Sequence, residues 1–206
     1  MNQNRNCGLL LFSTLAFVSG GCAADTEELE ADRIQSEAQV TKPVFSFATF
    51  APVAGAVAKL NREDDGHEVE EDTRELPAGH VVALWYVAYN APENCTNPIP
   101  GLSNCSIPDS QNFATEPTVL WADAIVVGAN GEGEFTSFVG LGTAGAPGEI
   151  LFGGGLTDVD GAEVHYLTRD KGAVVADRLD EQMSSFFGAC DVAACQDLQF
   201  ALIPPN

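Results

Sequence analysis

The sequence predicts an all-β protein, an antiparallel β-sandwich of about eight short strands with one short helix near the C-terminus. Short apolar segments of strand length recur along residues 43–206, and Gly and Pro separate them. Only one segment in this range has helical periodicity. No period of the length typical of repeat proteins is present, so a single layered domain is expected.

The first strands are predicted by alternation and by a turn sequence. Phe45–Phe50 alternates apolar and small residues, as a half-buried strand does. Ala56–Arg62 and His67–Leu76 flank Asp64-Asp65-Gly66, whose residues favour a hairpin turn. The second arm is rich in acidic residues, which is typical of an exposed edge strand, because charge deters edge-to-edge pairing.

His80–Tyr89 is apolar on both alternating faces, which predicts a central strand covered on both sides. Periodicity alone also fits a buried helix, but the β-branched and aromatic content favours a strand. Thr118–Val127 and Glu134–Val139 are separated by GANGEG, which predicts a second hairpin with an Asn-Gly turn. The remaining strands are expected at 149–152, 162–169 and 197–203, the last ending at two prolines.

The one predicted helix covers residues 177–187. Leu179, Met183, Phe186 and Phe187 fall on one face. Asp177 is suited to cap the first turn, and Gly188 is suited to end the helix.

The N-terminus predicts export. Arg5 precedes an apolar run too short to span a bilayer, so residues 1–21 are interpreted as an export signal. Ser19-Gly20-Gly21-Cys22 resembles a bacterial lipobox, although Ser19 stands where Leu is usual, and this predicts lipidation of Cys22. Ordinary cleavage after Cys22-Ala23-Ala24 is the alternative, which would give a secreted or periplasmic protein.

Three regions follow from this: the signal at 1–21, an acidic tether at 22–42 and a β-sandwich domain at 43–206. The tether has too little apolar content to fold alone. With Cys22 lipidated, the protein is expected at the cell envelope, at the outer membrane where the cell has one. The chain has 30 acidic and 9 basic residues, so nucleic-acid binding is disfavoured. The envelope or extracellular partner is not identified by the sequence.

Four cysteines remain in the domain, namely Cys95, Cys105, Cys190 and Cys195. In an exported chain an even number favours disulfides, and local pairing, 95 with 105 and 190 with 195, is favoured over cross-pairing. The spacings do not fit paired zinc knuckles or a Cys-x-x-Cys redox centre. Asn94 and Asn104 begin formal glycosylation sequons, which are interpreted as coincidence in a bacterial protein.

Residues 91–117 form a loop longer than a simple connection. Its prolines and its predicted disulfide would stiffen it, which lowers the ordering cost of binding a partner. Covering one end of the sandwich is the alternative role, and it is favoured.

Glu163, His165 and Arg169 are the weak candidates for a catalytic site. Strand alternation places them on one face, where a carboxylate near a histidine can orient the imidazole for proton transfer. A solvated sheet face is the favoured interpretation, and a pocket in which His165 touches a nucleophile would favour a hydrolase instead. No G-x-S-x-G sequence is present, and a triad assembled by the fold stays open.

Asp158 and Asp160 are the weak candidates for calcium binding. Thr157–Glu163 offers alternating oxygen ligands and a glycine, but it lacks the spacing of a complete calcium loop. No metal site and no cofactor is therefore predicted. The glycine runs lack the Lys-Ser/Thr ending of a phosphate-binding loop.

A family resemblance covers roughly residues 77–200. The resemblance rests on four segments, which are, in chain order, PAGHVVALWYVAYNAPENC, ADAIVVGANGEGEF, GGGLTDVDGAEVHYLTRDKG and DEQMSSFFGACDVAACQDLQF. They resemble exported bacterial proteins of no established function that share a W-x-V-x-x-N-x-P-x-x-C segment, an A-E-V-H strand and two late cysteines. Members often have R-S-H-G where this chain has Arg169–Gly172, so a histidine metal site is disfavoured here.

The predicted function is a non-catalytic binding or structural module, exported and lipid-anchored at Cys22. The alternatives are a hydrolase that uses His165 with Glu163, and a calcium-stabilised adhesion module.

Overall fold

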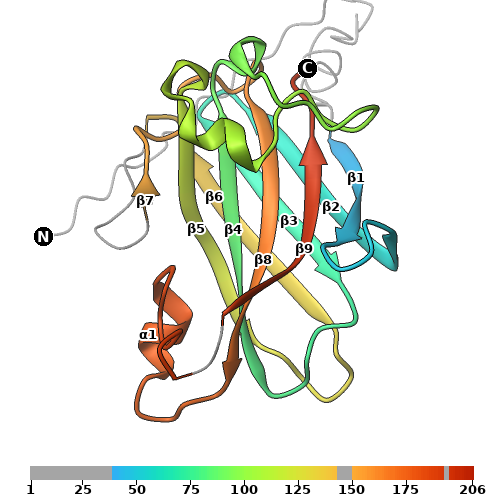
Figure 1. Ribbon diagram of the computed structural model, residues 1–206, viewed down its shortest axis with the longest axis vertical. Coiled ribbons are helices and arrows are strands. Elements are labelled where there is room, and N and C mark those ends of the chain that lie inside the picture. The colour runs from blue at the N-terminus through green and yellow to red at the C-terminus, as the bar shows by residue number, and fades with distance from the viewer. Residues whose placement is uncertain (1–38, 143–149, 193–194) are drawn as a thin grey trace, which may run out of the picture. The chain divides into compact units, whose positions relative to one another are not determined.

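Nine strands form one continuous antiparallel sheet in the order β6-β3-β2-β1-β9-β8-β4-β5-β7 (Figure 1). The computed structural model describes residues 39–142, 150–192 and 195–206, all within the unit Glu37–Asn206. In chain order the strands are β1 (Val40–Ser46), β2 (Pro52–Glu63), β3 (Gly66–Thr73), β4 (His80–Tyr89), β5 (Pro117–Val126), β6 (Gly133–Gly140), β7 (Ile150–Phe152), β8 (Glu163–Ala173) and β9 (Gln196–Ile203).

The sheet curls, so that its two halves face each other as two layers. In Figure 1, β3 and β6 run behind β4 and β8. The inward side chains form the main core, in which Leu60 and Val69 belong to the same cluster as Leu84 and Tyr86. The predicted all-β antiparallel fold with one short helix is confirmed, and its two layers come from one sheet that curls through its own twist.

β4 is the central strand that its sequence predicts. It pairs with β5 on one side and β8 on the other, and every residue from Val81 to Tyr89 is buried. Its inward side chains join the main core. Its outward side chains form a second apolar cluster, which includes Trp85, Val87 and Tyr89. The strand is apolar on both faces because another layer of the protein covers each face.

The first predicted hairpin is present, but its acidic arm is not an edge. β2 and β3 pair up to Glu63 and Gly66, which leaves Asp64-Asp65 as the turn. β3 also pairs with β6, so its acidic residues lie between two strands. Alternation then sends Glu68 to solvent and buries Glu71, a difference that acidic content alone does not reveal.

The second predicted hairpin is wrong. β5 pairs with β4 and β7, whereas β6 pairs with β3 at the opposite end of the strand order. The Asn-Gly sequence lies in the segment 127–132, in which Gly131 has a positive φ of 69°. This segment is long enough to carry the chain from one layer to the other, where the Gly131 carbonyl accepts a hydrogen bond from Leu76.

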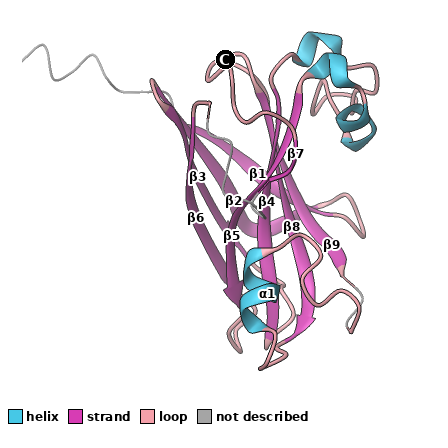
Figure 2. Ribbon diagram, turned by 90° about the vertical axis from the view of Figure 1, so that its left-hand side faces the viewer, coloured by secondary structure: helices cyan, strands magenta, loops and turns pink. Residues whose placement is uncertain are grey.

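The helix is shorter than predicted. α1 covers Leu179–Ser184, and its N-cap position is Arg178. Its buried residue is Gln182, while Phe187 is 66 % exposed. Three short 3-10 helices, η2 (Pro92–Asn94), η3 (Ile107–Gln111) and η4 (Phe113–Thr115), lie in the loop between β4 and β5, as Figure 2 also shows. None of the described helices is long and apolar enough to cross a membrane.

The start of the domain lies earlier than predicted. β1 begins at Val40, so the last residues assigned to the acidic tether are part of the sheet. The signal 1–21, Cys22 and residues up to 38 lie outside the described residues.

Glu71 is a buried carboxyl group without a hydrogen-bond partner among the described residues. Burial raises the pKa of Glu71 from 4.5 to about 8, and the negative charge of Asp72 adds a smaller contribution in the same direction. The folded protein therefore holds a proton that the unfolded chain releases above pH 4.5. Stability consequently falls as the pH rises from about 4.5 to about 8.

Glu71→Gln should remove most of this pH dependence, because glutamine keeps the shape but does not ionise. The wild-type free energy of unfolding should fall by up to roughly 4 kcal/mol between pH 5 and pH 8, at 1.4 kcal/mol per pKa unit. Urea unfolding at both pH values measures it. Glu68→Gln, at an exposed position of the same strand, is the control and should retain the wild-type dependence. An identical dependence in Glu71→Gln and wild type would contradict a protonated Glu71.

Candidate functional site

The outer face of β4 and β8 carries the candidate site. In the register of these strands Tyr89 lies opposite Glu163, Val87 opposite His165 and Trp85 opposite Leu167. The side chains alternate along each strand, so these residues share the face turned away from the main core. His165 and Arg169 line the same cavity on this face.

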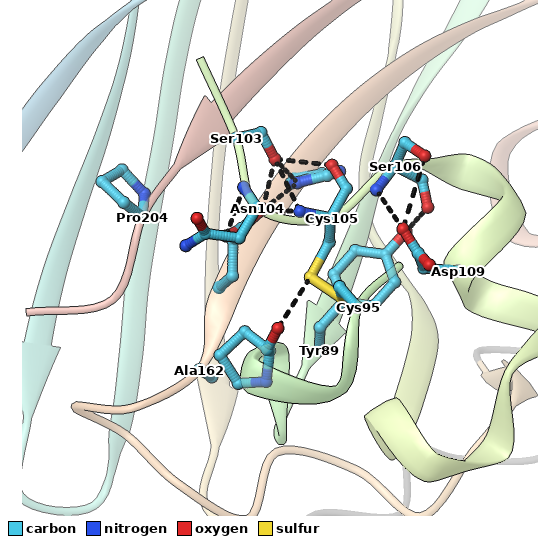
Figure 3. Close-up of polar contacts among 12 residues, drawn as sticks. Tyr89, Cys95, Ser103, Asn104, Cys105, Ser106, Asp109, Ala162 and Pro204 are labelled. Carbon is cyan, nitrogen blue, oxygen red and sulfur yellow. Dashed lines mark hydrogen bonds and ion pairs between the residues drawn. A yellow bond between two sulfur atoms is a disulfide. The ribbon is translucent and has the colours of Figure 1, made fainter. Parts of the chain in front are cut away.

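Glu163 is the anchor of the site. Its carboxylate accepts hydrogen bonds from the Asn104 amide at 3.1 Å, the Cys105 amide at 3.0 Å and Nε2 of His165 at 2.9 Å. The Ser103 hydroxyl donates a fourth. Ser103, Asn104 and Cys105 come from the loop between β4 and β5, and Figure 3 shows these three residues side by side. The carboxylate thus ties that loop to the start of β8.

The charge of Glu163 is stabilised although the side chain is fully buried. Burial acts to raise its pKa, but the hydrogen bonds that the carboxylate accepts, those from His165 and Ser103 foremost, outweigh burial. The pKa of Glu163 is therefore held below its ordinary value. The favoured prediction of a solvated face is wrong at this end of β8, because the loop covers Glu163 and leaves His165 only 3 % exposed.

A second carboxylate, Asp109, organises the loop itself. It accepts hydrogen bonds from the Thr96 and Asn97 amides at 2.9 and 3.2 Å. It also accepts one from the Ser106 amide at 2.9 Å, which Figure 3 shows. Burial acts to raise the pKa of Asp109, and these bonds lower it below its ordinary value. Asp109 therefore joins the segment that follows Cys95 to the segment that follows Cys105, as the disulfide between these two cysteines also does.

Both predicted local disulfides are present. Cys95 and Cys105 have Cα atoms 5.2 Å apart, and Cys190 and Cys195 have theirs 5.1 Å apart. The first closes the loop over the outer face, where Cys105 is buried in the same cluster as Trp85. Disulfides persist in oxidising compartments, so the two pairs indicate a protein that lies outside the cytoplasm.

The cavity on this face has a volume of about 210 Å³. Residues of β4 and β8 line it together with Ile107 and Ser110 of η3 and with Phe186, which follows α1, and β5, β7 and β9 complete the lining. Its walls are mainly apolar, with His165, Arg169 and Asp197 as the ionisable groups besides Tyr89. Nε1 of Trp85 is buried in the wall without a hydrogen-bond partner among the described residues.

Buried polar side chains fasten α1 beside the cavity. Gln182 donates to the carbonyls of Lys171 and Ala173 at 3.1 and 3.0 Å. Lys171, itself fully buried, donates to the carbonyls of Ser185 and Phe186. Phe186 is thus held against Trp85, with ring centroids 4.4 Å apart.

Asp158 and Asp160, the calcium candidates, lie in the turn before β8. Each carboxylate accepts a hydrogen bond from within the chain, at 2.8 and 3.0 Å. The Val159 carbonyl between them accepts from Nε of Arg62 at 3.0 Å and contacts Nε2 of His67 at 2.7 Å. No group of three or more His, Cys, Asp or Glu side chains in the described ranges is arranged to hold a metal ion.

Sequence reasoning did not single out Ser103, Asp109 or Trp85. Asp109 had a signal, because Ser106-Ile-Pro-Asp109 has the spacing of a capping box, which opens η3 here. No local sequence signal identifies Ser103 or Trp85. The contact of Ser103 with Glu163 and the place of Trp85 in the cavity wall depend on how the loop and α1 fold back onto the sheet.

Comparisons with protein-family models, curated proteins and solved structures found no match to this chain. Function therefore has to be inferred from the site itself, and the family resemblance stays a prediction.

Glu163→Gln should destabilise the protein by about 3 kcal/mol at pH 7, as expected for removing one charge from a buried, hydrogen-bonded network. Thermal and urea unfolding measure the loss. The folded pKa of Glu163 is depressed, so its contribution is present above the unfolded value of 4.5 and is lost as the pH falls through the folded value. The difference between variant and wild type should therefore shrink below pH 4.5.

Glu93→Gln is the matched control, because Glu93 is an exposed carboxylate in the same loop. It should change stability by less than about 0.5 kcal/mol. Equal effects of the two substitutions would refute the anchoring role of Glu163.

Proposed function

We propose that the protein is an exported, lipid-anchored binding module of the cell envelope, and that its cavity is the ligand site. The carrying observation is an apolar cavity of about 210 Å³ on the outer face of β4 and β8, next to a loop fixed by a disulfide and two buried carboxylates. Concave apolar sites with a few convergent polar groups are the usual form of small-ligand sites.

The rigidity of the surroundings supports binding. The loop is ordered by Asp109 and Glu163, and α1 is ordered by Gln182 and Lys171, before any ligand arrives. A site with pre-ordered walls loses less conformational entropy on binding, so more of the contact energy becomes affinity.

Export and anchoring rest on the N-terminal sequence and the disulfides. The apolar run after Arg5, followed by small residues and Cys22, fits a lipoprotein signal. Both disulfides agree with an oxidising compartment. The acidic segment after Cys22 would then hold the domain away from the membrane.

A hydrolase is the second candidate, because Ser103 Oγ lies 3.0 Å from Nε2 of His165. That distance suits a nucleophile and its base. However, Glu163 contacts the same Nε2, whereas in a Ser-His-acid triad the acid binds the other ring nitrogen. The Ser103 hydroxyl donates to Glu163, and Ser103 does not line the cavity. This arrangement favours a structural role for Ser103.

Cys22→Ser should release the protein from the membrane. Lipidation at Cys22 predicts that the wild-type protein fractionates with membranes and carries the mass of added acyl chains, while the variant is soluble. Membrane fractionation and intact-mass spectrometry of the mature protein measure both. An unchanged mature mass in the variant would show that ordinary cleavage occurs instead.

The soluble Cys22→Ser chain should bind small apolar probes in the cavity. Indole and cyclohexanol should shift the NMR signals of Val87, Val119 and Leu167, which line it. Leu167→Trp should fill the cavity and abolish the shifts. Thr136→Trp, at an exposed position of β6, should leave them unchanged.

Absence of shifts at the cavity residues would refute the binding site. Hydrolysis of p-nitrophenyl acetate that Ser103→Ala abolishes, without loss of stability, would replace the binding module with the hydrolase.

A further inference from the structure

The cavity has two different polar ends. His165 and Arg169 are four residues apart on β8, which corresponds to roughly 13 Å along a strand. Leu167, Trp85 and Val87 lie between them and are apolar or aromatic. A ligand along this floor therefore meets a guanidinium at one end, an apolar middle and an imidazole at the other.

Arg169 has unused hydrogen-bonding capacity. Its Nε donates to Asp197 at 2.7 Å, and its guanidinium lies over the Phe186 ring at 4.3 Å from the centroid. No described residue accepts a hydrogen bond from Nη1 or Nη2. Arg178, in contrast, uses Nε and both of its Nη atoms on Glu181 and Asp191.

Lys171 places a second positive charge near the Arg169 end. Lys171 is buried close by and bonds only to backbone carbonyls, so its charge has no carboxylate bonded to it among the described residues. Burial, and next the charge of Arg169, lowers the pKa of Lys171 to about 8, which leaves the ammonium form predominant at pH 7. Arg169 is paired with Asp197, and the charge of Glu181 acts on Lys171.

The volume limits the ligand to a small molecule. A cavity of 150 Å³ accommodates one benzene ring, and this one has about 210 Å³. A six-membered ring or a short alkyl chain with one polar head group fits this space.

Resting on the proposed binding function, we infer that the cavity takes a small monocarboxylic acid with an apolar body. The carboxylate binds Nη1 and Nη2 of Arg169, a bidentate geometry that guanidinium favours. The apolar body packs along Trp85, Val87 and Leu167. Nε2 of His165 is held by Glu163, so Nδ1 is the nitrogen left to meet a polar group at the far end of a longer ligand.

Titrations of the soluble Cys22→Ser chain test this inference. The probes are 3-phenylpropanoate and hexanoate, with their neutral amides and with 3-phenylpropylamine. Trp85 in the cavity wall serves as the fluorescence reporter, with Trp121→Phe added to remove the other tryptophan. Each carboxylate should bind about tenfold or more tightly than its amide, and the amine should bind most weakly. The tighter of the two carboxylates identifies the body as aromatic or aliphatic.

Arg169→Met should abolish the preference for the carboxylate and leave binding of the amide nearly unchanged. Arg74→Met, which removes an arginine paired with Glu132 elsewhere on the surface, is the control and should keep the preference. Asp197→Asn should strengthen carboxylate binding, because it removes the competing anion. This variant keeps the test decisive if Arg169→Met proves unstable.

Equal affinities of carboxylate and amide in the wild type would overturn the inference while leaving the binding site in place. A preference that survives in Arg169→Met and weakens in Asp197→Asn would also overturn it. No binding of any probe, neutral or charged, would refute the proposed binding function as well.

Discussion

The buried carboxylate of Glu163 is the contact on which the outer face of the protein depends. It joins the first residue of β8 to three consecutive residues of a loop that is about 60 positions earlier in the chain. The loop is also attached to this part of the sheet by the cluster around Cys105 and by the hydrogen bond that the Tyr89 hydroxyl donates to the Ser106 carbonyl. The loop carries η3, whose Ile107 and Ser110 line the cavity, so Glu163 acts together with Asp109 and the disulfide to position this cavity wall.

Burying the charged carboxylate of Glu163 costs desolvation free energy, and hydrogen-bond donors around the carboxylate offset this cost. Two backbone amides, a hydroxyl and an imidazole converge on Glu163, and backbone amides likewise converge on Asp109. The disulfide between Cys95 and Cys105 adds ~2–3 kcal/mol by constraining the unfolded chain. Together these interactions hold an irregular segment in one conformation without a regular hydrogen-bonded ladder.

Local patterns in the sequence predicted the features that depend on neighbouring residues. The double apolar alternation of β4, the Asp64-Asp65 turn and the local disulfides were found because strand geometry and chain proximity determine them. Strand alternation also predicted that Glu163 and His165 share a face. It did not predict their burial, because burial depends on a loop that folds back over the sheet.

Long-range pairing was the main source of error. An Asn-Gly sequence predicted that β5 and β6 would pair, but a curled sheet can accept a strand at either end of its order, and β6 pairs with β3 along its whole length. Acidic content predicted that β3 would be an edge, although its alternation leaves room for one buried carboxyl group, Glu71. In both cases the deciding partner lies far away in the sequence.

Amide hydrogen exchange at Asn104 and Cys105 tests the anchoring of the loop most directly. Both amides lie outside regular secondary structure and donate only to the Glu163 carboxylate or, for Cys105, also to Ser103 Oγ. If the carboxylate holds the loop, both should exchange about a hundredfold or more slowly than the amide of Gly101, for which no hydrogen-bond partner is found in the described loop. Exchange of Asn104 and Cys105 as fast as that of Gly101 would contradict the anchor and the fixed cavity wall that follows from it.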